Sequence, residues 1–387
     1  CSIYLKGDLY MVYLDYAAAT PIDNEVLDTY YEISKKYYAN PNSSHKMGLE
    51  AKELIKECTN NIANTLNVLP EEIIYTSGAT ESNNLVIKGI CERYKNRGKH
   101  ILISALEHNS IVSAVTSMSE KGFEVEVIPV TKEGIIDIEA LKDMLRKDTI
   151  LVSICTVDSE IGLKQPLNEI SKVLKEYPNT IFHTDASQAV GKVDIDYSLV
   201  DLATITPHKF YGPTGIGILV KKKNIDLKPQ IEGGKSTTIY RSGTPSLPLI
   251  AASSKAISLA INNQNNRNNH IKELSNIVKD TLSKYNNVYI NNTNDSIPHT
   301  INFSIKGIPA LEVQRKLEEH NIYLSTKTSC CPIETPSKLV YALTKDKSLS
   351  SSSLRLSISH LTTKEEIDIF LQAFNSIYKE YEENGKI

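Results

Sequence analysis

The chain has 387 residues, and its 43 Lys and Arg against 46 Asp and Glu give a formal net charge of −3. This balance excludes a protein that holds nucleic acid by bulk positive charge. A content of 41% hydrophobic and 23% charged residues excludes a disordered chain. At about 150 residues per domain, the length predicts two or three domains.

The chain contains six cysteines, at Cys1, Cys58, Cys91, Cys155, Cys330 and Cys331. No pair has C-x-x-C spacing, which disfavours a disulfide framework or a zinc site and fits a reducing compartment. No apolar run approaches the ~18 residues that cross a bilayer, and the beginning of the chain lacks the pattern of a secretion signal. We therefore expect a cytoplasmic protein that neither enters a membrane nor binds nucleic acid directly.

Helical and strand patterns alternate between residues 47 and 220. Helices are predicted at residues 46–66, 80–94, 110–121, 138–146 and 167–177. Strands are predicted at residues 72–76, 100–104, 124–129, 149–155, 180–184, 201–206 and 216–220. Such alternation predicts an α/β fold of three layers, in which helices cover both faces of a mainly parallel sheet.

After Pro248 the pattern changes. Helices at residues 249–262 and 268–285 are followed by strands near Val288 and Thr300, a helix at 310–320, a loop, a strand at 354–358 and a helix from Lys364. Elements without strict alternation predict a smaller α+β domain. We therefore expect a terminal segment at 1–20, with 1–10 an added leader before Met11, a large domain at 21–248 and a small domain at 249–387.

Three segments could carry chemistry. The first is Thr76-Ser-Gly-Ala-Thr-Glu81, which follows a strand and opens a helix. Its small residues would let the N–H groups near Ala79 and Thr80 approach a phosphate; an ordinary capped turn is the alternative. The segment lacks the G-x-x-x-x-G-K-[ST] spacing of a P-loop, which disfavours a nucleoside triphosphate.

The second segment is His183-Thr-Asp185-Ala-Ser-Gln188, at the end of a predicted buried strand. A carboxylate there needs a cationic partner, which could be a protonated pyridine nitrogen or an Arg. His183 and Asp185 could also bind a metal, but no third ligand lies at a spacing typical of a metal site. The third is Thr206-Pro-His208-Lys209, before a Gly/Pro turn, where a lysine held in a pocket can bond covalently to an aldehyde. Together the three segments supply what pyridoxal 5'-phosphate requires.

The chain also resembles the cysteine desulfurases of the NifS/IscS group, within the class V aminotransferase-like, fold-type I pyridoxal phosphate enzymes. The resemblance runs nearly end to end. Besides the segments above, it rests on Tyr13-Leu-Asp-Tyr-Ala-Ala-Ala-Thr-Pro21, Asn40-Pro-Asn-Ser-Ser-His45, Glu107-His108, Tyr211-Gly-Pro213, Arg241-Ser-Gly-Thr244 and Ser329-Cys330.

The resemblance implies a role for each matching residue. Lys209 would carry the cofactor aldehyde and Asp185 would pair with the ring nitrogen. His108 would stack on the ring and move protons, and Gln188 would bind the ring oxygen. The remaining phosphate and substrate contacts would come from Ala79, Thr80, Thr206, His208, Thr244 of a partner subunit, Arg355 for the substrate carboxylate, and Asn40.

The resemblance also places the persulfide-forming cysteine at Cys330, in a polar loop where a nearby cation favours a reactive thiolate; Cys331 is an extra thiol. The implied function is removal of sulfur from L-cysteine, leaving L-alanine and a Cys330 persulfide for a protein acceptor, in a homodimer. Such enzymes supply iron–sulfur cluster assembly or thiolation of cofactors and tRNA. Alternatives are a selenocysteine lyase, a cysteine C–S lyase, and a weakly active sulfur-carrier or scaffold homologue.

The chain departs from the family pattern in several places. Ser159 stands where the family usually has an Asn that contacts the cofactor, and residues 235–238 differ from a Gly-Gly-Gly-Gln-Glu-like stretch. The Cys330 loop lacks its usual glycine. These differences leave substrate preference, rate and acceptor open, and affect the cofactor assignment less.

Overall fold

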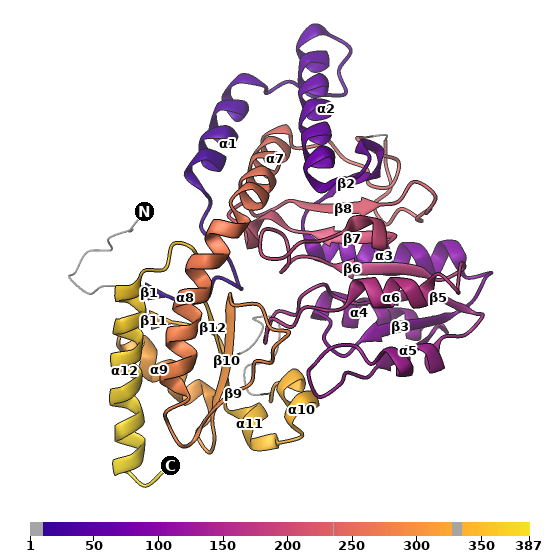
Figure 1. The fold of residues 1–387 in the computed structure, drawn as a ribbon. Coiled ribbons are helices and arrows are strands. Elements are labelled where there is room, and N and C mark those ends of the chain that lie inside the picture. Colours follow the sequence, from indigo (N-terminus) through magenta and orange to yellow (C-terminus); the bar gives the residue numbers. More distant parts are fainter. Residues whose placement is uncertain (1–10, 235, 327–334) are drawn as a thin grey trace. The chain divides into compact units, whose positions relative to one another are not determined.

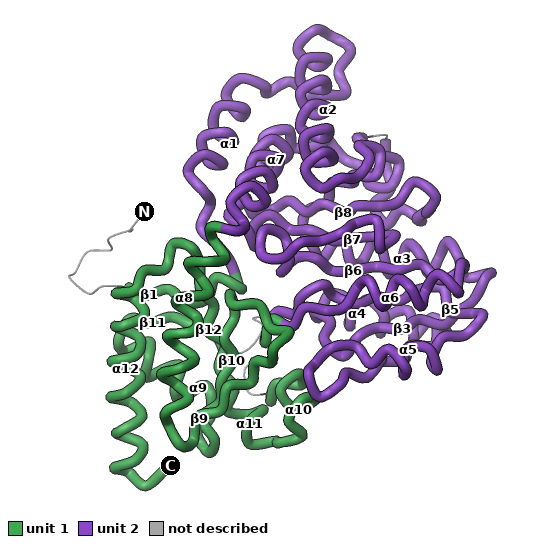
Figure 2. Tube along the Cα trace, viewed as in Figure 1, with its two compact units in different colours: residues 1–18, 160–162, 266–387 green, residues 19–159, 163–265 purple. Residues whose placement is uncertain are grey.

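The computed structural model describes residues 11–234, 236–326 and 335–387. Figure 2 colours its two compact units. Unit 1 comprises residues up to Ala18, Glu160–Gly162 and Asn266–Ile387, and unit 2 comprises Ala19–Ser159 and Leu163–Asn265. The boundary expected at residue 248 lies inside a helix that groups with unit 2.

Unit 2 is built on a seven-stranded sheet with strand order β2-β8-β7-β6-β5-β3-β4. Its strands are β2 (Ile73–Thr76), β3 (His100–Ser104), β4 (Glu124–Ile128), β5 (Thr149–Ser153), β6 (Ile181–Asp185), β7 (Leu202–Ile205) and β8 (Gly217–Lys221). The pairs from β4 to β7 are parallel, and β8 runs antiparallel to both β7 and β2. This confirms the mainly parallel sheet predicted from the alternating pattern.

The helices of unit 2 are α1 (Asn24–Lys36), α2 (Lys46–Leu66), α3 (Ala79–Tyr94), α4 (Asn109–Ser119), α5 (Ile138–Met144), α6 (Leu167–Leu174) and α7 (Leu247–Asn262), with short 3₁₀ turns η1 (Pro70–Glu72), η2 (Tyr197–Leu199) and η3 (Pro207–Lys209). The helices lie against this sheet or, in the case of α1 and α2, pack on α7 (Figure 1). Every residue of β3, β5, β6, β7 and β8 is buried. Burial on both faces explains why most of these strands are rich in apolar residues.

Unit 1 is an α+β arrangement around a three-stranded antiparallel sheet with order β12-β10-β9. Its elements are β1 (Val12–Tyr13), α8 (Gln264–Leu282), which begins in unit 2, β9 (Val288–Ile290), β10 (Thr300–Ile305), α9 (Ala310–Glu319), β11 (Ile322–Tyr323), α10 (Lys338–Thr344), α11 (Lys347–Ser351), β12 (Ser353–Ser357) and α12 (Lys364–Glu383). β1 pairs in parallel with β11. Phe303, Phe370 and Phe374 are fully buried in its apolar core.

The prediction of a loop between residues 320 and 354 is wrong in part, because α10 and α11 lie in this range. Ser337 and Asp346 cap these two helices with side-chain hydrogen bonds, and such capping compensates for the weak helix propensity of the serines in α11. Within the described residues, no helix has both the length and the apolar character needed to span a bilayer.

Candidate active site

The anion-binding helix start expected from the sequence lies where β2 passes into α3. β2 ends at Thr76 and α3 begins at Ala79, and the N-cap residue Gly78 supplies no side-chain acceptor. The first backbone N–H groups of the helix, including that of Thr80, therefore point toward a position that suits a phosphate. A Cβ at Gly217 would lie 2.6 Å from the carbonyl carbon of Gly78, so glycine lets β8 approach this turn closely.

Asp185 is the last residue of β6 and is 6% exposed. Its Oδ2 accepts a hydrogen bond from Asn83 Nδ2 at 2.8 Å, and its Oδ1 accepts one from the backbone N–H of Ser187 at 2.9 Å. Both donors are neutral, and no Lys or Arg in the described ranges forms an ion pair with this carboxylate. A buried carboxylate without a cation is costly, so the site fits the protonated ring nitrogen of pyridoxal 5'-phosphate.

Thr206, His208 and Lys209 lie in and beside η3, in the turn that follows β7. Thr206 Oγ1 and His208 Nδ1 are 3.0 Å apart and share a hydrogen bond, and the N–H of Lys209 donates to the Thr206 carbonyl at 3.3 Å. Burial, with a smaller contribution from the Lys209 charge, lowers the pKa of His208 to about 4. His208 is therefore neutral at pH 7 and can donate one hydrogen bond to an anion.

His108 caps the N-terminus of α4, where its Nδ1 accepts a hydrogen bond from the backbone N–H of Ser110 at 3.1 Å. Its pKa is lowered, first by burial and then by the charge of Lys209, while the Asp185 carboxylate acts in the opposite direction. His108 thus lies within electrostatic range of Asp185 and of Lys209.

Arg355 lies on β12 in unit 1 and is 1% exposed. Its Nη2 donates to Asp15 Oδ1 at 2.7 Å, and the second carboxylate oxygen of Asp15 accepts from Ser325 Oγ at 2.8 Å. A buried guanidinium held by a carboxylate suits the binding of a second carboxylate. Cys330 and Cys331 lie outside the described residues.

The other predicted residues lie in different surroundings. Gln188 is buried, and its Oε1 accepts a hydrogen bond from Lys192 Nζ at 2.7 Å. Ser159 is the last residue before the Glu160–Gly162 segment of unit 1. Asn40 is exposed in a turn, where its side chain accepts from the backbone N–H of Asn42 at 2.9 Å.

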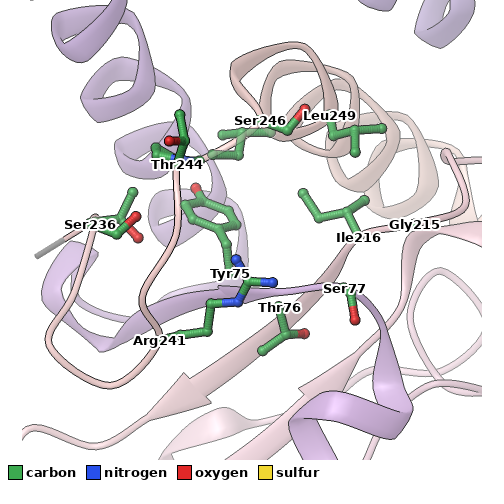
Figure 3. Close-up of a pocket in the computed structure, with 13 residues that line it drawn as sticks. Tyr75, Thr76, Ser77, Gly215, Ile216, Ser236, Arg241, Thr244, Ser246 and Leu249 are labelled. Atoms are coloured by element: carbon green, nitrogen blue, oxygen red, sulfur yellow. The ribbon is translucent and has the colours of Figure 1, made fainter. Parts of the chain in front are cut away.

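Thr244 lines a pocket of about 190 Å³ next to the start of α3 (Figure 3). Its lining includes Arg241, several hydroxyl side chains and the apolar Ile216 and Leu249. Thr76 is the last residue of β2, and Ser77 lies in the turn before α3. Glu81 connects the Arg241 segment to the turn before α3, because its carboxylate accepts hydrogen bonds from Arg241 Nε at 2.9 Å and from the backbone N–H of Ser77 at 2.7 Å. Although burial opposes it, these hydrogen bonds hold the pKa of Glu81 below its ordinary value.

Four residues that contact or adjoin predicted site residues have no role in the sequence-based assignment. Asn83 and Ser110 link Asp185 to His108, Glu107 is a buried carboxyl group beside His108, and Asp15 holds Arg355. The signal in the sequence is a polar residue within an otherwise buried stretch. That signal shows that a partner is needed but does not show which residue supplies it.

Comparison with known proteins gives consistent results. The family model described as aminotransferase class-V matches residues 12–370. The chain is 39% identical to the NifS/IcsS protein homolog of Lactobacillus delbrueckii subsp. bulgaricus, over 96% of this chain and 98% of that protein. It is 37% identical to the cysteine desulfurase IscS of Dictyoglomus turgidum, over 95% of this chain and 94% of that protein.

The fold has close counterparts among solved structures. The NifS-like protein from Rickettsia africae superposes with a TM-score of 0.86 at 32% sequence identity, covering 96% of this chain and 100% of that one. The residues matched by the family model, 12–370, include every predicted site residue.

Proposed function

Because the chain belongs to the aminotransferase class-V family and, within it, to the NifS/IscS group, we propose that it is a cysteine desulfurase that depends on pyridoxal 5'-phosphate. The observation that carries the proposal is the similarity to named NifS and IscS proteins over 95–96% of the chain. The buried Asp185 carboxylate, whose hydrogen-bond donors among the described residues are neutral, supports a cofactor with a cationic ring.

The cofactor would be held mainly by residues of unit 2. The N–H groups at Ala79 and Thr80 would bind its phosphate together with Thr206 and His208, and Asp185 would bind its ring nitrogen. Gln188, Ser159 and His108 would lie along the ring, and Thr244 of a partner subunit would complete the phosphate site. When bound, pyridoxal 5'-phosphate supplies an aldehyde for the substrate amine and a ring that withdraws electrons.

The residues of this chain then have separate tasks. Arg355 would bind the carboxylate of L-cysteine, with Asn40 beside the substrate, and Lys209 Nζ would take the α-proton. The Cys330 thiolate would attack the substrate sulfur, so that a sulfur–sulfur bond forms while the substrate carbon–sulfur bond breaks. The carbon that loses the sulfur would take up a proton and the α-carbon would regain one, so that L-alanine would leave, and the Cys330 persulfide would pass its outer sulfur to a protein acceptor.

Exposed apolar side chains support the proposed homodimer. In α1, Leu27 and Tyr31 are 48% and 55% exposed, and in α2, Met47 and Leu49 are 41% and 54% exposed. α1 packs on α7 through one face and carries Glu25, which pairs with Lys255 at 2.6 Å. A second subunit would cover the opposite face.

The activity is tested by measuring alanine and sulfide formed from L-cysteine, with and without a thiol reductant. We expect one alanine for each sulfur transferred, and sulfide release that requires the reductant. Equal sulfide without reductant would instead indicate a C–S lyase, and no alanine would indicate a weakly active homologue. A selenocysteine lyase would form alanine from selenocysteine and not from cysteine.

Cys330→Ser should abolish sulfur transfer while L-cysteine still binds and changes the cofactor absorbance, because the ring chemistry does not need this thiol. Cys331→Ser is the matched control at the next position and should keep most of the activity. The opposite result for the two variants would move the reactive thiol to Cys331.

A further inference from the structure

A chain of three hydrogen bonds links the carboxylate of Asp185 to the imidazole of His108. Asn83 Nδ2 lies 2.8 Å from Asp185 Oδ2 and 2.8 Å from Ser110 Oγ, and Ser110 Oγ lies 2.9 Å from His108 Nδ1. The two linking residues come from α3 and α4, and both are buried, with Asn83 0% and Ser110 7% exposed.

The direction of these hydrogen bonds follows from the amide of Asn83. The Asp185 carboxylate can only accept, so the amide must turn its NH₂ group toward it. The two hydrogens of that group then go to Asp185 and to Ser110 Oγ, and the amide Oδ1 remains buried without a hydrogen-bond partner. Because Ser110 Oγ accepts from Asn83, its own hydrogen is available to His108 Nδ1.

His108 Nδ1 also faces a donor whose direction is fixed. The backbone N–H of Ser110 lies 3.1 Å from this nitrogen and cannot accept a hydrogen bond. Nδ1 must therefore present its lone pair, and a neutral imidazole then carries its hydrogen on Nε2. The same N–H and hydroxyl both disfavour protonation of Nδ1.

We infer that Asn83 and Ser110 are positioning residues that hold His108 as the Nε2–H tautomer. In this form the imidazole offers a hydrogen-bond donor at Nε2 to the bound cofactor and substrate. The part of the inference that concerns the reaction rests on the proposed desulfurase function. The tautomer itself depends only on the described hydrogen bonds.

The charged groups around His108 are Asp185 at the end of β6 and Lys209 in η3, and the neighbouring residue Glu107 is a buried carboxyl group. Asp185 favours the charged imidazole, whereas burial and Lys209 oppose it. Ser110→Ala removes one donor to Nδ1 and leaves these charges in place. The pKa of His108 should therefore rise, by about half to one pH unit for the loss of a single neutral hydrogen bond.

The test uses ¹⁵N spectra of the holoenzyme labelled at histidine, without substrate, in which His108→Gln identifies the resonances of His108 among the nine histidines. We expect a neutral ring protonated at Nε2 at pH 7 to 8. Ser110→Ala should raise the pKa, and Ser110→Thr, which keeps a hydroxyl, should restore it. Ser113→Ala is the control, because Ser113 lies on the exposed face of the same helix.

A wild-type ring protonated at Nδ1 would overturn the inference whatever the variants show. An unchanged pKa in a folded Ser110→Ala protein would overturn the role of Ser110. In Asn83→Leu, Ser110 Oγ loses the donor that directs its hydrogen to His108, so the pKa should also rise, and an unchanged pKa would overturn the role of Asn83. None of these readouts requires turnover. Failure to form alanine from L-cysteine would therefore refute the proposed function and leave the tautomer in place.

Discussion

Glu107 is a carboxyl group whose two oxygens have different surroundings. Its Oε1 accepts hydrogen bonds from Ser104 Oγ and from the backbone N–H of Cys155, whereas its Oε2 is buried without a hydrogen-bond partner. Burial raises the pKa of Glu107 to about 8, and the nearby Asp185 charge acts in the same direction. The folded protein therefore keeps this carboxyl group protonated at pH 7.

This shift predicts how stability depends on pH. The unfolded chain loses the Glu107 proton near pH 4.5 and the folded chain near pH 8. Between these values the folded state binds more protons, so the stability gained from the neutral carboxyl is complete below pH 4.5 and is lost as pH rises toward 8. Glu107→Gln, which cannot ionise, should remove a slope of up to about 1.4 kcal/mol per pH unit.

The measurement compares the free energy of unfolding of wild type and Glu107→Gln in denaturant at about pH 5.5 and 7.5. Relative to the wild type, the free energy of unfolding of Glu107→Gln should be higher at pH 7.5 than at pH 5.5. Glu120→Gln, at an exposed position after the end of α4, serves as the control. Parallel pH profiles for wild type and Glu107→Gln would contradict the raised pKa.

At the scale of elements, Arg355 is held by three segments of unit 1. It lies on β12, its side chain pairs with Asp15, which follows β1, and its backbone forms a bridge with Ser325, which follows β11. Ser325 also donates to Asp15, so the same carboxylate fixes all three segments. The side chains of Arg355 and Asp15 are 2% and 17% exposed, and breaking such a pair leaves a charge uncompensated.

Asp15→Ala should therefore lower the free energy of unfolding by about 3 kcal/mol, whereas Asp15→Asn, which keeps an acceptor for Arg355, should lower it by less. Denaturant unfolding followed by a probe in unit 1 would measure both. Glu50→Gln breaks the exposed pair of Glu50 with Lys46 and should change stability by less than about 0.5 kcal/mol. Equal effects of Asp15→Ala and Glu50→Gln would mean that Asp15 does not hold Arg355.

The elements also show how far a single sequence can predict this fold. The strands of the large sheet could be predicted, because most of them are short, mainly apolar segments that are buried on both faces. α1 could not, because Val26 is its only buried residue and its other apolar side chains do not form a buried stripe. α10 and α11 depend on side-chain caps, which short serine-rich segments do not reveal.

Some features of the candidate site could likewise be predicted from the sequence, and others could not. The helix start at Ala79, the strand end at Asp185 and the turn at Lys209 could each be predicted, because each follows from a local pattern of residues. The pairing of Asn83 with Asp185, and of Asp15 with Arg355, joins positions that are 102 and 340 residues apart. Packing decides such pairings, and no local pattern contains them.

At the scale of the whole molecule, the exposed apolar face of α1 predicts a homodimer of about 86 kDa, twice the 43.1 kDa of one chain. Leu27 and Tyr31, four positions apart, lie on the same face of the helix and are 48% and 55% exposed. The double change Leu27→Glu and Tyr31→Glu places two charges where a partner would bury apolar surface. We expect this variant to elute as a monomer in size-exclusion chromatography with light scattering.

The monomer should also lose its cofactor faster on dialysis, because the proposed phosphate site takes Thr244 from the partner subunit. Thr244→Ala in the dimer should reproduce this faster loss without changing the mass, which separates the contribution of Thr244 from that of association. Val127→Glu is the matched control, since Val127 is 53% exposed on the edge strand β4. It should leave both mass and cofactor retention unchanged. A wild-type mass near 43 kDa, or a monomeric variant that keeps its cofactor as long as the wild type, would contradict a site shared between subunits.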